Sequence, residues 1–147
     1  MNQIKHVHRE TPMDYQPFCI EGNQSLIVYH QREVEFAYRT EPPHGDAIYS
    51  WRLPLLALEF PYWVYGRNLL CFESRFLLAE AVRKNSWSPV TSMVFDLQEG
   101  KYADLTHWYP RVTVKGKEIC LSNEWEGRNL VLKDVHSLDW VGVGECK

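Results

Sequence analysis

Short segments in which apolar and polar residues alternate, each bounded by turn residues, follow one another along most of this chain. Between residues 33 and 39, for example, Val34, Phe36 and Tyr38 take one set of alternate positions, and the other set is mostly charged. Because successive side chains of a strand point to opposite faces of a sheet, this spacing is typical of a strand with one buried face. The repeated segments predict an all-β fold, or a β-rich α+β fold, in which an antiparallel meander forms a sandwich or an open barrel.

The expected strands are separated by proline, glycine and other turn residues. The most detailed prediction concerns residues 112–121, where a four-residue loop would pair Val114 with Ile119 and Val112 with Leu121 on one apolar face. Further strands are expected at residues 26–30, 33–39, 47–53, 69–72, 92–97, 102–108, 130–132 and 138–143, with an edge or bulged strand at 54–61, which prolines bracket.

Residues 74–85 permit two interpretations. Their leucines and alanines are good helix formers, and Ser74 and Asn85 could cap a helix of about 10 residues. However, the segment follows the apolar residues 69–72 after only a tight link, and it leads into the strand expected at 92–97. We therefore predict a strand here.

The length of the chain indicates one domain. With 147 residues, folding can bury roughly 70% of the surface of the unfolded chain, which is enough for an ordinary core. We expect a single β-rich domain over residues 1–147. Residues 1–17 contain two prolines and little periodicity, so they are expected to form an irregular arm.

The sequence also bears on the cellular compartment. Residues 1–10 are polar and basic, and the most apolar segment, 53–64, contains two prolines, so neither a secretory signal nor a membrane-spanning helix of about 20 residues is expected. Four cysteines, at positions 19, 71, 120 and 146, are scattered singly, without the close pairs of zinc or redox sites. An even count would allow two disulfide bonds in an exported protein, but we expect a cytoplasmic protein with free thiols.

Negative charge is concentrated near the C-terminus. Residues 1–117 carry 13 acidic and 13 basic side chains, whereas residues 118–147 carry 6 acidic and 3 basic ones. Nucleic-acid binding depends on a basic surface, so nucleic acid is not expected as a direct partner, whereas a basic protein such as a toxin domain is compatible with this balance. The acidic residues expected to face such a partner are Glu118, Glu124, Glu126, Asp134 and Asp139.

Six tryptophans supply the other candidates for binding. Trp51 and Trp63 lie in strongly apolar segments and are expected in the core. Trp125 lies between two glutamates, and Trp108 and Tyr109 precede a proline, which are polar or turn contexts. Because tryptophan and tyrosine dominate interface hot spots, we expect at least one of these three side chains to be exposed for a partner.

Histidines are the remaining candidates for chemistry. His6 and His8 could face one side of a strand, but a metal site needs further ligands, and none is near in the sequence. His107 and His136 lie close to acidic residues, as general acid–base catalysis requires, but neighbouring residues of a strand or turn usually point apart. We therefore assign no catalytic residue, metal or cofactor, and we expect binding instead of catalysis.

A further pattern extends from residue 73 to residue 102. It consists of ESRFLLAE at 73–80, a linker that contains Trp87, VFDL at 94–97 and GKY at 100–102. This pattern resembles small bacterial immunity proteins of contact-dependent or type VI toxin systems. It also resembles one blade of a β-propeller, although a complete propeller of even four blades would be longer than this chain. The first resemblance implies a cytoplasmic protein that binds and neutralises a cognate toxin, and it carries over no functional residue.

Two alternatives remain open. A small-molecule-binding β-barrel of about eight strands would place the aromatic residues around a cavity. A hydrolase would use His107 or His136 beside a carboxylate in a cleft. The sequence by itself favours an immunity protein that covers a toxin with tryptophan and carboxylate groups.

Overall fold

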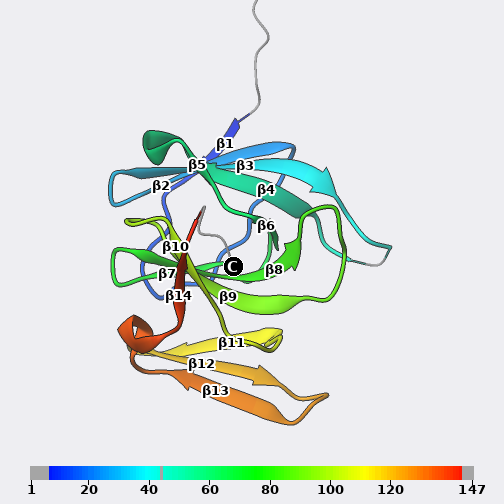
Figure 1. Ribbon diagram of the computed structural model, residues 1–147, viewed down its shortest axis with the longest axis vertical. Coiled ribbons are helices and arrows are strands. Elements are labelled where there is room, and N and C mark those ends of the chain that lie inside the picture. The colour runs from blue at the N-terminus through cyan, green and yellow to red at the C-terminus, as the bar shows by residue number, and fades with distance from the viewer. Residues whose placement is uncertain (1–6, 44, 144–147) are drawn as a thin grey trace, which may run out of the picture.

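The computed structural model describes residues 7–43 and 45–143, and these form 14 β-strands and two short 3₁₀ helices (Figure 1). The all-β expectation is therefore confirmed. The strands are β1 (Val7–Glu10), β2 (Gln24–Tyr29), β3 (Arg32–Thr40), β4 (Ile48–Leu53), β5 (Leu58–Glu59), β6 (Tyr62–Tyr65), β7 (Leu70–Phe72), β8 (Phe76–Arg83), β9 (Thr91–Asp96), β10 (Lys101–Asp104), β11 (Arg111–Lys115), β12 (Glu118–Asn123), β13 (Arg128–Leu132) and β14 (Trp140–Gly142), and the helices are η1 (Pro54–Leu56) and η2 (Val135–Ser137).

The larger of two sheets contains 11 strands. They are linked in the order β1-β2-β3-β4-β6-β8-β9-β10-β14, with β5 added to β4 and β7 added to β8. The pairs are antiparallel except for β1 and β2, which run parallel. Within the described residues β1 and β14 are not neighbours, so this sheet does not close into a barrel. The smaller sheet, in the order β11-β12-β13, lies below the larger one in Figure 1.

The larger sheet curls around an aromatic core. Trp51 stacks on Phe60 with ring centroids 4.3 Å apart and meets Phe95 edge-on at 4.6 Å. Trp51 is only 2% exposed, as expected for a core residue. Trp63, also expected in the core, is half-buried against a separate apolar cluster around Val82. The aromatic side chains thus fill the interior of the curled sheet.

Strand β8 confirms the strand prediction for the ambiguous segment. Leu77 packs into the core of the curled sheet, whereas Leu78 packs into a second core between the larger and the smaller sheet. Because both faces are covered, the usual alternation gives way to a continuous apolar run, which also suits a helix. Glu73 and Ser74 have positive φ angles of 54° and 57°, the left-handed conformation of a tight turn, so the chain reverses from β7 directly into β8.

The smaller sheet has the predicted register. Val114 pairs with Ile119, and Val112 pairs with Leu121. The connecting turn is shorter than expected, because Lys115 also pairs with the residue opposite it, Glu118. Ile119 and Leu121 are buried in the second core, so one apolar face of this sheet packs against the outer face of the larger sheet.

The strand expected at residues 102–108 is shorter in the structure. It ends at Asp104 as β10, because the Asp104 carboxylate accepts a hydrogen bond of 2.6 Å from the backbone N–H of Thr106. Such a side-chain turn competes with strand pairing. Thr106 has a positive φ of 78°, and residues 105–110 form a loop that leads to β11.

The N-terminal segment differs from the expected irregular arm. Within residues 1–17, β1 forms a regular strand beside β2, whereas residues 11–17 form none. Backbone contacts nevertheless hold this segment, since the N–H of Tyr15 donates a 2.8 Å hydrogen bond to the carbonyl of Cys71. The Asp14 carboxylate also accepts a hydrogen bond from the Tyr29 hydroxyl.

Two features of the structure bear on the expected compartment, namely its helices and its cysteines. No helix in the described part of the chain is long and apolar enough to cross a membrane. The described cysteines are free thiols: Cys71 is buried, Cys120 is half-buried and Cys19 is exposed, while Cys146 lies outside the described residues.

Candidate partner-binding site

The residues expected to bind a partner lie at two different ends of the smaller sheet. Trp125, Glu124 and Glu126 lie in the turn between β12 and β13, while Glu118 lies at the opposite end of β12. Glu118 and Glu124 are six positions apart in the sequence, which is about 20 Å along an extended strand. Asp134 and Asp139 flank η2, which lies at that opposite end in Figure 1. The predicted set is therefore not one acidic surface.

Tyr109 is not part of the exposed surface. Its side chain is 5% exposed and packs into the second core, and its backbone N–H donates a 2.8 Å hydrogen bond to the Ser92 hydroxyl. The polar context before Pro110 suggested exposure, but the loop folds back along β9 and turns this ring inward. Tyr109 therefore supports the site from below and cannot contact a partner directly.

The two tryptophans of the set meet in space. The rings of Trp108 and Trp125 are stacked, with centroids 6.1 Å apart and an angle of 18° between their planes. Trp125 is 81% exposed, and Trp108 is half-buried beneath it. We call this pair, with the turn 123–128 and the loop 105–110 that carry it, the tryptophan end of the smaller sheet.

A buried carboxylate anchors the pair. The Trp108 indole Nε1–H donates a 2.7 Å hydrogen bond to Oε1 of Glu80, a residue of β8 that is 2% exposed. Arg67 donates from Nη2 to the same oxygen at 3.0 Å and from Nε to Oε2 at 3.2 Å, and the Asn68 side chain donates to Oε2 at 3.0 Å. Each carboxylate oxygen thus accepts two hydrogen bonds, which offsets the cost of burying the charge.

The arginine at this anchor remains charged. Burial by itself lowers the pKa of Arg67, but hydrogen bonds and charge from Glu80 and Asp46 outweigh burial, and the pKa is raised. Its Nη1 lies 2.9 Å from Oδ2 of Asp46, and its guanidinium lies 4.3 Å from the centre of the Tyr65 ring. The anchor therefore joins the β3–β4 loop, β8 and the loop before β11.

Side-chain amides hold the backbone of the tryptophan end. Asn68 donates a 3.1 Å hydrogen bond to the carbonyl of Pro110, and Asn123, which is buried, donates one of 3.1 Å to the carbonyl of Trp108. The Asn123 side chain also accepts a bond from the N–H of Glu126 at 3.2 Å. These contacts fix the backbones of the loop and the turn relative to each other, so the two residues that carry the stacked rings are positioned before any partner arrives.

Two ion pairs involve the glutamates on either side of Trp125 in the sequence. Nη1 of Arg111 lies 2.9 Å from Glu124, and Nε of Arg128 lies 3.0 Å from Glu126. All four side chains are well exposed to solvent, where such pairs contribute about 0–1 kcal/mol. The two glutamates expected to present negative charge are thus balanced by basic neighbours of the same molecule.

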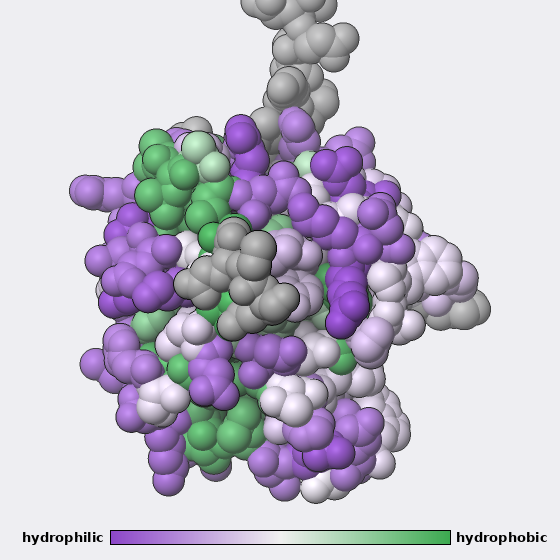
Figure 2. Space-filling model, in the orientation of Figure 1, coloured by the Kyte–Doolittle hydropathy of each residue, from purple (hydrophilic) through white to green (hydrophobic). Residues whose placement is uncertain are grey.

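Another exposed apolar area lies on η1. Figure 2 shows apolar residues gathered over this helix at the upper left, where Leu55 and Leu56 are 67% and 45% exposed. No residue of η1 is buried. The tryptophan end differs because its exposed ring is stacked on a residue that is tied to the core.

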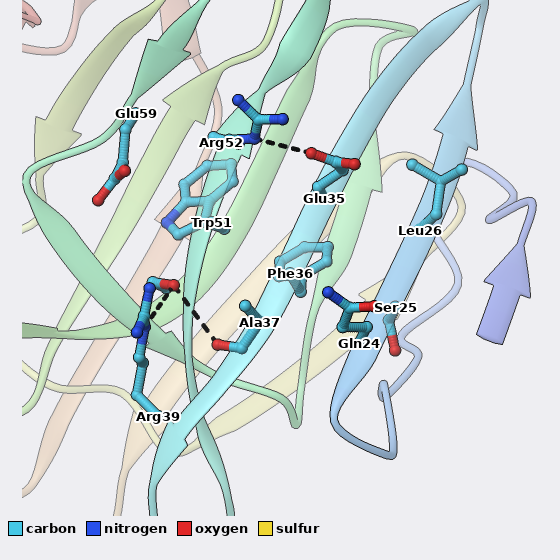
Figure 3. A pocket seen from close by; sticks show the side chains of 11 residues that line it. Gln24, Ser25, Leu26, Glu35, Phe36, Ala37, Arg39, Trp51, Arg52 and Glu59 are labelled. Atoms are coloured by element: carbon cyan, nitrogen blue, oxygen red, sulfur yellow. Dashed lines mark hydrogen bonds and ion pairs between the residues drawn. The ribbon is translucent and has the colours of Figure 1, made fainter. Parts of the chain in front are cut away.

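Two hollows bear on the two alternative functions. A hollow of about 610 Å³ lies over β2–β5, but charged side chains border it, with Arg52 pointing toward Glu35 in Figure 3. The interior that an aromatic-lined barrel would need is filled by ring stacking. Of the two histidines, His107 lies beside Arg128. His136 lies 3.5 Å from the exposed carboxylate of Glu73 and borders a hollow of about 190 Å³ that Asp96 and Glu99 also line.

Metal binding has no site in the part of the chain that the structure describes. No group of three or more histidine, cysteine, aspartate or glutamate side chains there is placed to hold an ion. His6 lies outside the described residues, and so does the side chain of His8.

Sequence reasoning missed the residues that organise the tryptophan end, namely Glu80, Arg67, Asn68 and Asn123. One signal was present, since Glu80 interrupts a continuous apolar run. A charged residue in a strand buried on both faces must be paired, but its partners lie 12 to 28 residues away and cannot be identified from spacing.

The chain matches no protein-family model, no curated protein and no solved structure.

Proposed function

We propose that the protein binds a partner protein at the tryptophan end of its smaller sheet. One observation carries this proposal: Trp125 is 81% exposed, yet it is stacked on Trp108, whose indole is hydrogen-bonded to the buried Glu80. Tryptophan is enriched among the few residues that supply most of the energy of an interface. Hydrogen bonds from Asn123 already fix the backbone of the turn and the loop, so binding orders fewer groups, which favours affinity.

The nature of the partner is a finer part of the proposal. We propose a basic protein such as a toxin domain, with this chain acting as a cytoplasmic bacterial immunity protein that covers it. The support is the resemblance of residues 73–102 to such proteins, together with the net charge of −3 and its excess in residues 118–147. Opposite net charges would speed association of the two proteins.

Calorimetry tests both parts. The purified protein is titrated with the product of the neighbouring upstream gene, and Trp125→Ala is compared with Trp87→Ala. Trp87 is a suitable control because it is also partly exposed, at 46%, but lies on the β8–β9 loop. We expect Trp125→Ala to cost at least about 2 kcal/mol of binding free energy and Trp87→Ala to cost far less. Absence of binding at micromolar concentration, or equal losses in both variants, would contradict the proposal.

A further inference from the structure

The free face of Trp125 indicates the kind of side chain that a partner brings to it, an inference that rests on the proposed function. Trp108 lies against one side of the ring, which is 81% exposed. The residues on either side in the sequence are Glu124 and Glu126, whose carboxylates are held near the same turn by Arg111 and Arg128. The turn therefore combines an open indole face with two carboxylates.

Both carboxylates already bind a guanidinium group. The distances from Arg111 to Glu124 and from Arg128 to Glu126 are 2.9 Å and 3.0 Å, so their geometry suits this donor. Because these pairs are exposed and weak, an incoming arginine can exchange with either of them. The arrangement thus accepts a guanidinium without the burial of an uncompensated charge.

The indole face itself favours a cation. A guanidinium over an aromatic face is attracted by the ring electrons, and tryptophan is the strongest of the aromatic side chains in this respect. Within the described residues, Arg67 lies over Tyr65 and Arg75 lies over Phe76, whereas no basic side chain lies over Trp125. The indole ring of Trp125 is therefore open to a cation from a partner.

We propose that an arginine side chain of the basic partner lies on the free face of Trp125 and pairs with Glu124 or Glu126 in exchange with Arg111 or Arg128. A hydroxyl-rich or anionic ligand would instead use these two arginines as donors. Substitution of Arg111 or Arg128 therefore separates these possibilities. It should strengthen the binding of a partner arginine and weaken the binding of a hydroxyl-rich or anionic ligand.

The test uses a synthetic peptide of alternating glycine and arginine, and the same peptide with citrulline, a neutral analogue of arginine. Binding is followed through the indole N–H signal of Trp125 in the NMR spectrum of the ¹⁵N-labelled protein, assigned with Trp125→Phe. We expect the arginine peptide to shift this signal and the citrulline peptide to leave it in place. Glu124→Gln or Glu126→Gln should weaken binding about 2- to 5-fold, and Arg111→Gln or Arg128→Gln should tighten it by a similar factor.

Matched variants at the other end of the sheet control for net charge. Glu118→Gln and Lys117→Gln change the charge of the molecule by the same amounts and should alter binding far less. Equal shifts from both peptides, weaker binding in Arg111→Gln, or an effect of Glu118→Gln as large as that of Glu124→Gln would each overturn the inference.

The two proposals fail in different ways. If Trp125→Ala abolishes binding of the neighbouring gene product while the peptide results are negative, the binding site is correct and the arginine contact is wrong. If the peptide results are positive and that gene product does not bind, the arginine contact stands and the proposed toxin partner is wrong.

Discussion

Glu80 and Asp96 are both buried carboxylates, on the neighbouring strands β8 and β9, and an arginine holds each in the same way. Arg67 reaches Glu80 with Nε and Nη2 at 3.2 and 3.0 Å, and Arg75 reaches Asp96 with the same two atoms at 3.0 and 2.7 Å. The two carboxylates differ in the other groups that donate hydrogen bonds to them.

The other donors to Asp96 are local, whereas those to Glu80 come from distant loops. Asp96 accepts backbone N–H groups of Gln98 and Glu99, at 2.9 and 3.1 Å, within its own hairpin turn. Glu80 accepts from Asn68 and Trp108, which lie 12 and 28 residues away. The same chemistry thus shapes a turn in one place and assembles a binding surface in the other.

The largest expected effect comes from Glu80→Ala. Removing this carboxylate leaves Arg67, Asn68 and Trp108 without their buried acceptor, so we expect the free energy of unfolding in urea to fall by about 3–5 kcal/mol. Electronic coupling between the two stacked indoles is expected to give a circular-dichroism band, and Glu80→Ala should weaken this band because Trp108 loses its hydrogen-bond acceptor. Glu118→Ala, at an exposed position, should change stability by no more than about 0.5 kcal/mol. A loss below about 1 kcal/mol in Glu80→Ala would mean that the anchor is dispensable.

Asp96→Asn tests the contrast with Glu80. It should lower the free energy of unfolding but leave the circular-dichroism band of the stacked indoles unchanged. Loss of the charge-assisted hydrogen bonds should cost roughly 1.5–3 kcal/mol near neutral pH. Burial by itself raises the pKa of Asp96, but hydrogen bonds from Arg75 and from the backbone of Glu99 and Gln98 outweigh burial, and the pKa lies below its ordinary value of 3.8.

The lowered pKa of Asp96 predicts a dependence on pH. A group whose pKa is lower in the folded state stabilises the fold above its unfolded pKa, and this contribution is lost as pH falls through the folded value. The stability difference between the parent protein and Asp96→Asn should therefore shrink below about pH 4. Urea unfolding at neutral and acidic pH checks this, and a difference that is constant with pH would show that the carboxylate charge is not what stabilises the turn.

Asn123→Ala tests the tie between the turn and the loop. It removes one bond to the carbonyl of Trp108 and one from the N–H of Glu126, and it should cost about 1–2 kcal/mol because Asn123 is buried. Asn129→Ala, on the exposed face of β13, should cost no more than about 0.5 kcal/mol. If both variants unfold at the same urea concentration as the parent, the hydrogen bonds of Asn123 do not stabilise the tryptophan end.

The smallest effect on stability is expected for Trp125→Ala. This side chain is 81% exposed, so its removal should change the free energy of unfolding by less than about 1 kcal/mol, whereas Trp51→Ala in the core should cost about 3–5 kcal/mol. A large loss of stability in Trp125→Ala would show that the ring serves the fold and would remove the reason to treat it as a contact for a partner.

Much of the fold was predictable because its signals are local. The pairing of Val114 with Ile119 follows from side-chain direction and turn length, and the structure confirms it. The alternation in residues 33–39 holds for the buried Val34 and Phe36, whereas Tyr38, on the same face, is 38% exposed. The β9–β10 turn around Asp96 is equally local. The strand expected at 102–108 was too long, because the hydrogen bond from Thr106 to Asp104 ends it early.

The candidate site was predictable only in part. Trp108 and Trp125 were identified from their polar and turn contexts, and they do meet, but Tyr109 is buried, and the acidic residues divide between two ends of the sheet. Their positions depend on how β12 and β13 pair, since residues close in the sequence lie far apart along an extended strand. Charge counted along the chain therefore does not describe a surface.

The amino-acid sequence by itself determined most of the strands, though not β1 or β6, and the all-β class, because these depend on backbone preferences and alternation over a few residues. Only the tertiary structure decided that Glu80 is the anchor of an exposed tryptophan pair, because its four hydrogen bonds come from segments that the packing of two sheets brings together. A buried charge must be paired, but which distant donors pair with it depends on the complete fold.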